Sequence, residues 1–342
     1  MNAKQKFTAA TGSTQFLEAN QDAALEVYLK TKGWIDREDK VLSTEKPGEG
    51  NMNFVLRVRT KEGSFIVKQA RPWVEKYPQL EAPIGRIHTE SQFYSLVQTN
   101  ETLKEYTPLL LATDLDNFLI KVEDLGNGAD FSYVYQKGQS FEQAELESLV
   151  TFLQILHHSD FSWASSSYPK NQALKALNHE HIFDFPYRAD NGMDLNAIQA
   201  GLHDLASPIY ADKALVSTIV KLGERYLGEG QHLIHGDYYP GSWLKVDGKV
   251  RVIDPEFSYF GLAEFDLSVF IAHMKMAQST PTAIHWVKEN YERPAGFDEK
   301  LLDQFTGTEI LRRLIGIAQL PLALSIEEKQ GLIEEAISLI TG

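Results

Sequence analysis

The spacing of apolar residues changes partway along this chain and separates two kinds of predicted structure. In roughly the first third, short stretches alternate apolar and polar side chains, which is typical of strands with one buried face. Further along, apolar residues recur every three or four positions, which is typical of amphipathic helices. The pattern therefore predicts an α+β chain whose first part contains a sheet and whose second part is mainly helical.

The first part is predicted to contain a β-hairpin, two further strands and two helices. Residues 52–59 and 64–70 alternate on either side of a Lys-Glu-Gly turn, which predicts the hairpin. A glycine-containing loop, 47–51, precedes it. The other predicted elements are helices 14–30 and 84–98 and strands 109–112 and 118–122.

The second part is predicted to consist of helices interrupted by one hairpin. Residues 243–246 and 249–253 flank Asp247-Gly248, a dipeptide that favours a two-residue hairpin turn. The predicted helices are 141–157, 195–205, 213–227, 264–277, 282–291, 299–320 and 327–340. Because glycines interrupt the pattern at 126–128, we expect one domain at 1–125 and a second at 126–342.

Composition narrows the classes of function. The chain has 342 residues, no cysteine and a formal charge of −14, with 33 Lys and Arg against 47 Asp and Glu. The missing cysteines exclude disulfides, thiolate metal sites and thiol nucleophiles. The negative charge argues against binding to nucleic acids or anionic membranes. No apolar stretch approaches the ~18 residues of a membrane span and no signal peptide is recognisable, so we expect a cytoplasmic protein.

Acidic residues flank the predicted hairpin of the second part. His235-Gly236-Asp237 precedes it, with Ser242 five positions after the aspartate, and Asp254-Pro255-Glu256 follows it. Because a short hairpin brings its ends together, we expect Asp237, Asp254 and Glu256 to converge. Carboxylates that share a small volume repel one another unless a cation lies among them, and oxygen ligands without His or Cys favour Mg²⁺. This combination predicts a phosphoryl-transfer site.

The protein-kinase plan provides a test of this prediction. It requires a glycine-rich loop, a strand lysine, a helix glutamate, a catalytic aspartate and a metal-binding acid, in this order. The chain offers all of them: Gly48 and Gly50 in the loop, Lys68 on the second strand of the first hairpin, Glu90 on the following helix, Asp237 and Asp254. Lys68 supplies the local positive charge that an acidic protein needs to bind a nucleotide.

These motifs resemble those of the aminoglycoside phosphotransferase and choline kinase superfamily, and within it most closely those of the 5-methylthioribose kinases. The Gly-Ser after the aspartate and the Asp-Pro-Glu metal motif are the methylthioribose kinase forms. The resembling segments are 50–54, 66–70, 86–90, 122–125, 235–242, 252–257 and 311–318. The resemblance implies a bilobal protein-kinase-like fold, with a small N-lobe built on an antiparallel sheet and a larger, mainly helical C-lobe.

The resemblance also implies roles for individual residues. Asp237 is the general base toward the anomeric hydroxyl of the sugar, Asp254 and Glu256 hold Mg²⁺ together with Ser242, and Asp266 braces the catalytic loop. Arg312 and Arg313 close the acceptor pocket. The residues implied in ATP binding are Gly48, Gly50, Asn51, Asn53, Lys68, Glu90, Glu123 and Leu125. Methylthioribose kinases tend to dimerise, so a homodimer is a possible assembly of this chain.

The identity of the acceptor stays open. The segment 177–187 looks more like other superfamily members than like the methylthioribose kinases. The leading interpretation is an ATP-dependent kinase for 5-methylthioribose or a related sugar. The alternatives are a phosphotransferase for an aminoglycoside, choline or an amino alcohol, and a catalytically silent nucleotide-binding protein. The histidines at 157–158, 179 and 181 are interpreted as packed or surface side chains rather than metal ligands.

Overall fold

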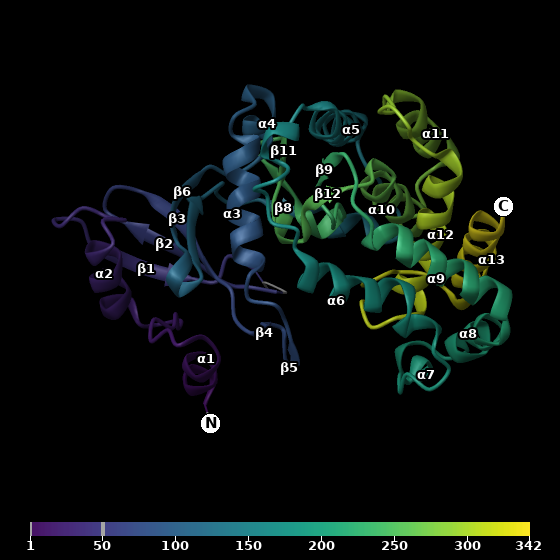
Figure 1. The fold of residues 1–342 in the computed structure, drawn as a ribbon, viewed down its shortest axis with the longest axis horizontal. Helices are drawn as coiled ribbons and strands as arrows, with labels where there is room; N and C mark the ends of the chain where they lie inside the picture. The colour runs from purple at the N-terminus through teal and green to yellow at the C-terminus, as the bar shows by residue number, and fades with distance from the viewer. Residues whose placement is uncertain (1, 49–51) are drawn as a thin grey trace. The chain divides into compact units, whose positions relative to one another are not determined.

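The computed structural model describes residues 2–48 and 52–342, and the chain forms two compact units, Met1–Asn127 and Gly128–Gly342. The boundary between them lies two residues after the predicted one. Figure 1 colours the first unit from purple to blue and the second from teal to yellow. Among the residues that the structure describes, no helix is both long and apolar enough to cross a membrane.

The first unit is built on a five-stranded sheet in the order β1-β2-β3-β7-β6, in which every neighbouring pair is antiparallel. Its strands are β1 (Val41–Glu45), β2 (Phe54–Thr60), β3 (Ser64–Gln69), β7 (Leu119–Glu123) and β6 (Leu110–Asp114). The predicted hairpin is β2–β3, with Leu56 opposite Val67 and Val55 opposite Lys68. Because β3 is the central strand, its residues 65–69 are buried, and this includes Lys68.

Within the described part of this unit, the α-helices that accompany the sheet are α1 (Ala3–Thr11), α2 (Asp22–Thr31), α3 (Arg86–Val97) and α4 (Glu101–Tyr106). The predicted helix at 14–30 is wrong in its first half, since α2 begins only at Asp22. Phe16 and Leu17 are buried in a segment without regular secondary structure, and the Leu17 amide donates to the Gln69 side chain at 2.9 Å. Contacts with the rest of the unit therefore hold this segment, although the spacing of its apolar residues had indicated a helix. A small hairpin of β4 (Trp73–Val74) and β5 (Tyr77–Glu81) was also not foreseen.

The second unit contains two small groups of strands. The predicted hairpin is present as β10 (Trp243–Val246) and β11 (Lys249–Val252), with β8 (Ala129–Asp130) added beside β10. Asp247 and Gly248 both have positive φ, as a two-residue type I′ turn requires. A second pair, β9 (His232–Ile234) and β12 (Tyr259–Gly261), was missed because each strand has only three residues.

Helices make up the rest of the second unit. They are α5 (Gln143–His158), α6 (Gln172–Phe183), α7 (Leu195–Ile198), α8 (Leu202–Ala211), α9 (Lys213–Leu227), α10 (Ala263–Met276), α11 (Pro281–Asn290), α12 (Glu299–Ile315) and α13 (Ile326–Thr341). The helix predicted at 299–320 ends earlier, at Ile315, because Gly316 leaves the helical conformation. This arrangement of a strand-rich unit and a helical unit confirms the α+β kinase-like prediction.

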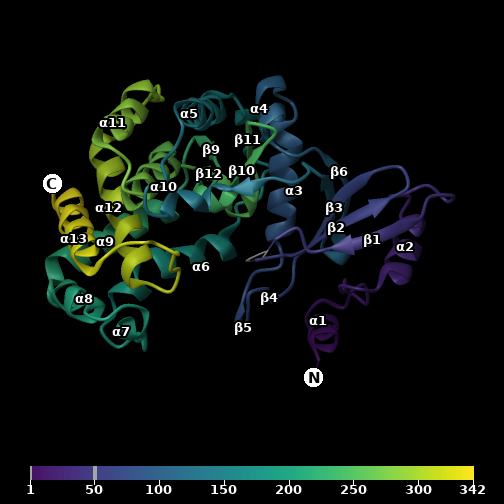
Figure 2. The ribbon, with the colours of Figure 1, turned by 180° about the vertical axis from the view of Figure 1, so that it is seen from behind.

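Helix α12 lies at the centre of the second unit's core. It packs against α10 and α13, and Figures 1 and 2 both show α12 and α13 side by side. The close approach depends on Gly307, where an added Cβ would lie 2.4 Å from the carbonyl oxygen of Ala336. Residues 306 to 315 of α12 are all buried, which fixes the position of every side chain near its C-terminal end.

Candidate functional site

The segment with the predicted catalytic aspartate follows β9 and is held by one buried carboxylate. Asp266 on α10 accepts a hydrogen bond from the backbone N–H of His235 at 2.6 Å and from that of Gly236 at 2.9 Å. Gly236 has a φ of 82°, and a Cβ there would lie 2.3 Å from the Phe257 carbonyl oxygen, so only glycine fits. Asp266 therefore fixes the backbone directly before Asp237, the contact that the sequence resemblance implied.

Asp266 is itself oriented from behind by a histidine. Nε2 of His157 lies 3.2 Å from Oδ2 of Asp266, and Nδ1 of His157 lies 2.7 Å from the Tyr291 hydroxyl. His157 and Asp266 are both completely buried. His157 is a packed histidine, as interpreted from the sequence. Its contact with Asp266 also helps to hold the loop before Asp237.

The hairpin β10–β11 joins the two ends of the predicted acidic site. The Ser242 hydroxyl donates to the backbone carbonyl of Asp237 at 2.9 Å, and the Ile253 amide donates to the carbonyl of Ser242 at 2.9 Å. Asp254 follows at once and has a φ of 60°, which is uncommon for a residue other than glycine. Such backbone strain is often retained at functional sites, because the surrounding structure maintains it.

The donor set on this hairpin is compatible with Mg²⁺. Glu256 is buried and Asp254 is partly buried, and both offer carboxylate oxygens without His or Cys. Mg²⁺ takes one or two carboxylates and completes its shell with water and phosphate oxygens. Over residues 2–48 and 52–342, however, no three or more His, Asp or Glu side chains are arranged to hold a metal, so Asp237 does not join Asp254 and Glu256 in a three-carboxylate metal site.

Asp237 faces two arginines instead. Nη2 of Arg313 lies 3.3 Å from Oδ1 of Asp237, and Nη2 of Arg312 lies 3.8 Å from the same oxygen. Both guanidinium groups belong to α12 and are at most 7% exposed. Adjacent helical residues point about 100° apart, but both arginine side chains are long enough to reach Asp237.

The arginines counteract the effect of burial on Asp237. Burial raises the pKa of Asp237, while the neighbouring Arg313 and Arg312 oppose this rise because they favour the charged carboxylate. Arg313 also stacks on the ring of Tyr239, with its guanidinium carbon 4.8 Å from the ring centre. The result is a carboxylate beside two fixed cations, all within the second unit.

The first unit brings together the predicted strand lysine and helix glutamate. Nζ of Lys68 on β3 lies 2.5 Å from Oε1 of Glu90 on α3, and both side chains are buried. In protein kinases this ion pair places the lysine for the nucleotide phosphates. The same geometry is therefore available here for an ATP phosphate.

The chain leading out of the glycine-rich loop is anchored by Arg86, which sequence reasoning had only noted as part of a resembling segment. Its guanidinium donates to the Asn53 side chain at 2.9 Å and to the Met52 carbonyl at 2.8 Å. Asn53 donates in turn to Glu90 at 3.4 Å. Gly48 precedes this part of the loop, whereas the predicted residues Gly50 and Asn51 lie outside the described residues.

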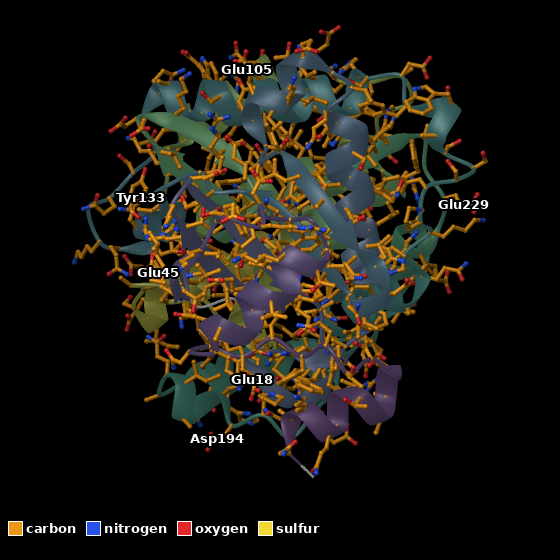
Figure 3. All side chains as sticks on the ribbon, turned by 90° about the vertical axis from the view of Figure 1, so that its left-hand side faces the viewer. Glu18, Glu45, Glu105, Tyr133, Asp194 and Glu229 are labelled. Atoms are coloured by element: carbon orange, nitrogen blue, oxygen red, sulfur yellow. The ribbon has the colours of Figure 1, made fainter. Side chains whose placement is uncertain are left out.

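The predicted adenine-binding segment lies at the end of β7. The Glu123 amide donates to the Leu109 carbonyl at 2.8 Å, so a base contact from Glu123 requires its carbonyl. Leu125 follows, partly buried. Between them Asp124 pairs with Arg57 at 2.9 Å, and Arg57 also pairs with Glu45, a residue labelled in Figure 3. This ion-pair network fixes the segment within the first unit.

Sequence reasoning missed one buried group that contacts the arginine pair. Glu309 on α12 accepts from Nε of Arg312 at 2.5 Å and from Nε of Arg313 at 2.8 Å. His273 lies 3.0 Å from the same carboxylate. The signal was present, because Glu309 precedes the arginines by three and four positions, the spacing at which helical side chains meet.

Comparison with known proteins gives two kinds of similarity. In sequence, the chain is 28% identical over 266 residues to methylthioribose kinase of Pectobacterium atrosepticum and 26% identical over 260 residues to that of Citrobacter koseri, covering 74% and 72% of this chain. The chain spans only 64% and 63% of the length of these relatives. No family model matches.

The fold is shared with solved phosphotransferases of low sequence identity. A spectinomycin phosphotransferase in complex with ADP and spectinomycin matches with a TM-score of 0.57 at 16% identity, over 96% of this chain and 99% of its own. A choline kinase from Cryptosporidium parvum matches with a TM-score of 0.52 at 13% identity, over 94% of each chain. These similarities agree with the resemblance stated from the sequence motifs.

Proposed function

We propose that this chain, a member of the aminoglycoside phosphotransferase and choline kinase superfamily, is a kinase that transfers the γ-phosphate of ATP to a hydroxyl of a small molecule. The observation that carries the proposal is the placement of Asp237. It lies on a loop fixed by Asp266, beside two buried arginines. A carboxylate held in this way can orient and deprotonate a hydroxyl nucleophile.

The transfer step follows from this placement. A carboxylate oxygen of Asp237 accepts the proton of the acceptor hydroxyl, and the hydroxyl oxygen forms a bond to the γ-phosphorus. The bond from that phosphorus to the β-phosphate oxygen breaks, so ADP leaves with the electron pair. Most of the rate enhancement in such reactions comes from positioning and from compensation of charge, which is what the fixed loop and Lys68 provide.

Two groups of side chains hold the nucleotide in this proposal. Lys68, oriented by Glu90, binds the phosphates, and the segment from Glu123 to Leu125 binds adenine through its backbone. Asp254 and Glu256, with Ser242, are the residues that hold Mg²⁺. When bound, the metal ion neutralises the charge that develops on the phosphate oxygens.

The arginine pair favours an acceptor without positive charge. Both guanidinium groups lie beside Asp237 and are bound by Glu309. Because the two cations balance these two carboxylates, the site has no excess negative charge to attract a cationic aminoglycoside or choline. We therefore propose 5-methylthioribose or a related neutral sugar as the acceptor, which accords with the sequence similarity to methylthioribose kinases.

Release of ADP from Mg-ATP tests the proposal. The acceptors to compare are 5-methylthioribose, ribose, choline and spectinomycin, with an acceptor-free reaction as the background. We expect turnover with methylthioribose well above background and none with the two cations. Turnover with choline or spectinomycin alone would overturn the acceptor assignment. No turnover with any of the four, together with no ATP binding by calorimetry, would overturn the kinase assignment.

A further inference from the structure

Glu309 is a buried carboxylate to which neither the transfer step nor nucleotide binding assigns a role. It is 1% exposed, on the helix that carries the arginine pair. Its two oxygens divide the pair between them, since Oε2 accepts from Arg312 and Oε1 accepts from Arg313. Each arginine binds Glu309 through Nε and directs an Nη group toward Asp237. Glu309, Arg312 and Arg313 are called the arginine clamp below.

A second layer of contacts fixes the carboxylate of Glu309. His273 on α10 is completely buried, and burial lowers its pKa to about 4, so its imidazole is neutral near pH 7. Its Nδ1 lies 2.5 Å from the Tyr135 hydroxyl and its Nε2 lies 3.0 Å from Glu309. A neutral imidazole that accepts from the tyrosine at Nδ1 carries its proton on Nε2, which then donates to Glu309.

Glu309 stays ionised in this environment. Burial alone would raise the pKa of its carboxyl, but the charges of Arg312 and Arg313 outweigh burial and hold that pKa well below its usual range. The site therefore contains two cations, Arg312 and Arg313, and two anions, Asp237 and Glu309. Their formal charges cancel. Without Glu309, Asp237 would balance only one of the two arginines, and one buried positive charge would remain uncompensated.

We propose that Glu309 is a positioning and specificity residue of the acceptor site: it directs both guanidinium groups toward Asp237 and cancels one of their charges, so that the site selects an uncharged acceptor over an anionic one. This role of Glu309 rests on the proposed kinase function and gives a physical reason for its uncharged acceptor. Two arginines without Glu309 would form a typical anion-binding pair, suited to a phosphorylated or carboxylated molecule. With Glu309 in place, the Nε donors are occupied and the charge is balanced.

The substitution Glu309→Gln tests the charge and keeps the shape. Steady-state kinetics with methylthioribose and Mg-ATP, with and without sodium sulfate as an anionic probe, give the readouts. We expect the KM for methylthioribose to rise about tenfold, as for the loss of one charge-assisted hydrogen bond, while the KM for ATP changes less than about twofold. Sulfate, competing with methylthioribose, is expected to inhibit the variant at least about fivefold more strongly than wild type, because the site gains one positive charge.

Glu145→Gln is the matched control. Glu145 is a buried glutamate on α5 that pairs with Lys245 at 2.9 Å and contacts neither the arginine clamp nor Asp237 among the described interactions. We expect this variant to leave both the methylthioribose KM and the sulfate inhibition within about twofold of wild type. Equal changes in both variants would show that any buried glutamate has this effect and would overturn the proposal.

Glu309→Asp separates position from charge and serves if the glutamine variant does not fold. It keeps the carboxylate but withdraws it by one methylene group, so the methylthioribose KM is expected to rise without stronger inhibition by sulfate. An unchanged methylthioribose KM in this variant would overturn the positioning role. Equal sulfate inhibition in wild type and Glu309→Gln would overturn the charge role. An inactive wild-type protein would instead overturn the proposed function itself.

Discussion

The carboxylate of Asp266 binds the backbone N–H of Gly236 at 2.9 Å, directly before the catalytic candidate Asp237. The same carboxylate accepts from His235, so one buried side chain fixes two successive peptide units. The backbone of this loop cannot move away from the arginine pair without breaking these two hydrogen bonds. The position of Asp237 is therefore a property of α10 as much as of the loop itself.

Replacing Asp266 with asparagine is expected to slow phosphate transfer and leave ATP binding unchanged. An amide offers one acceptor oxygen, and its NH₂ group cannot accept from a second backbone N–H. The loss of one charge-assisted hydrogen bond costs about 1.5–3 kcal/mol, so kcat should fall at least tenfold. ADP release and ATP calorimetry measure the two effects. A variant with wild-type kcat would contradict the bracing role of Asp266.

The pairing of Lys68 with Glu90 predicts that a substitution of Lys68 weakens the binding of ATP and leaves the binding of the acceptor unchanged. Lys68→Met removes the cation that we propose binds the phosphates, so the Kd for ATP should rise about tenfold or more while the KM for methylthioribose changes little. Lys121→Met is the control, because Lys121 lies on the neighbouring strand β7 and donates to the Trp34 carbonyl. If both variants lose ATP affinity equally, Lys68 has no specific part in binding.

A substitution of Asp254, which follows the hairpin β10–β11, should change the dependence of activity on Mg²⁺. Asp254→Asn removes one charged ligand, so the concentration of Mg²⁺ needed for half-maximal activity should rise about tenfold or more. Titration of Mg²⁺ at fixed ATP measures the change, and removal of the metal with EDTA should abolish turnover in wild type. Activity that persists in EDTA would rule out the metal in the mechanism.

His273 predicts how stability changes with pH. Its pKa is about 4 in the folded chain and near 6.5 in an unfolded one, so between these values the unfolded state binds the extra proton. Stability should therefore fall as the pH decreases from 6.5 toward 4. Buried groups that face the imidazole are Glu309, Tyr135 and Arg313.

His273→Gln removes that titration and keeps an amide that can bind Glu309. Its Tm should decrease less than that of wild type between pH 6.5 and pH 4.5, even if it is lower at pH 7. Thermal unfolding followed by circular dichroism across this range provides the comparison. Parallel Tm profiles for the two proteins would assign the acid sensitivity to other groups.

Motif order in the sequence predicted contacts between motif residues, such as Lys68 with Glu90, but it did not predict every contact of Asp237. Lys68, Glu90, Asp237 and Asp266 could be placed because a strand, a helix and a loop in fixed order determine which of them meet. The pairing of Asp237 with Arg312 and Arg313 could not, since it joins segments 75 and 76 positions apart whose packing depends on the whole core of α12.

The same dependence on tertiary packing explains the errors in the predicted secondary structure. Residues 14–21 have helical spacing of apolar residues, yet Leu17 lies outside any helix and its amide donates to Gln69. The strands β9 and β12 are too short for any period to appear. Glu309 was missed because a glutamate on a helix usually faces solvent, and only the packing of α10 against α12 buries it.

The most direct test of the account is the appearance of a phosphate monoester on 5-methylthioribose. Wild type and Asp237→Asn are incubated in parallel with Mg-ATP and methylthioribose, and the product is followed by ³¹P NMR. The account predicts a new monoester signal with wild type and a rate about 10²–10⁴-fold lower with the variant, as for the loss of a general base. Monoester formation at equal rates in both proteins, or no monoester with wild type, would contradict it.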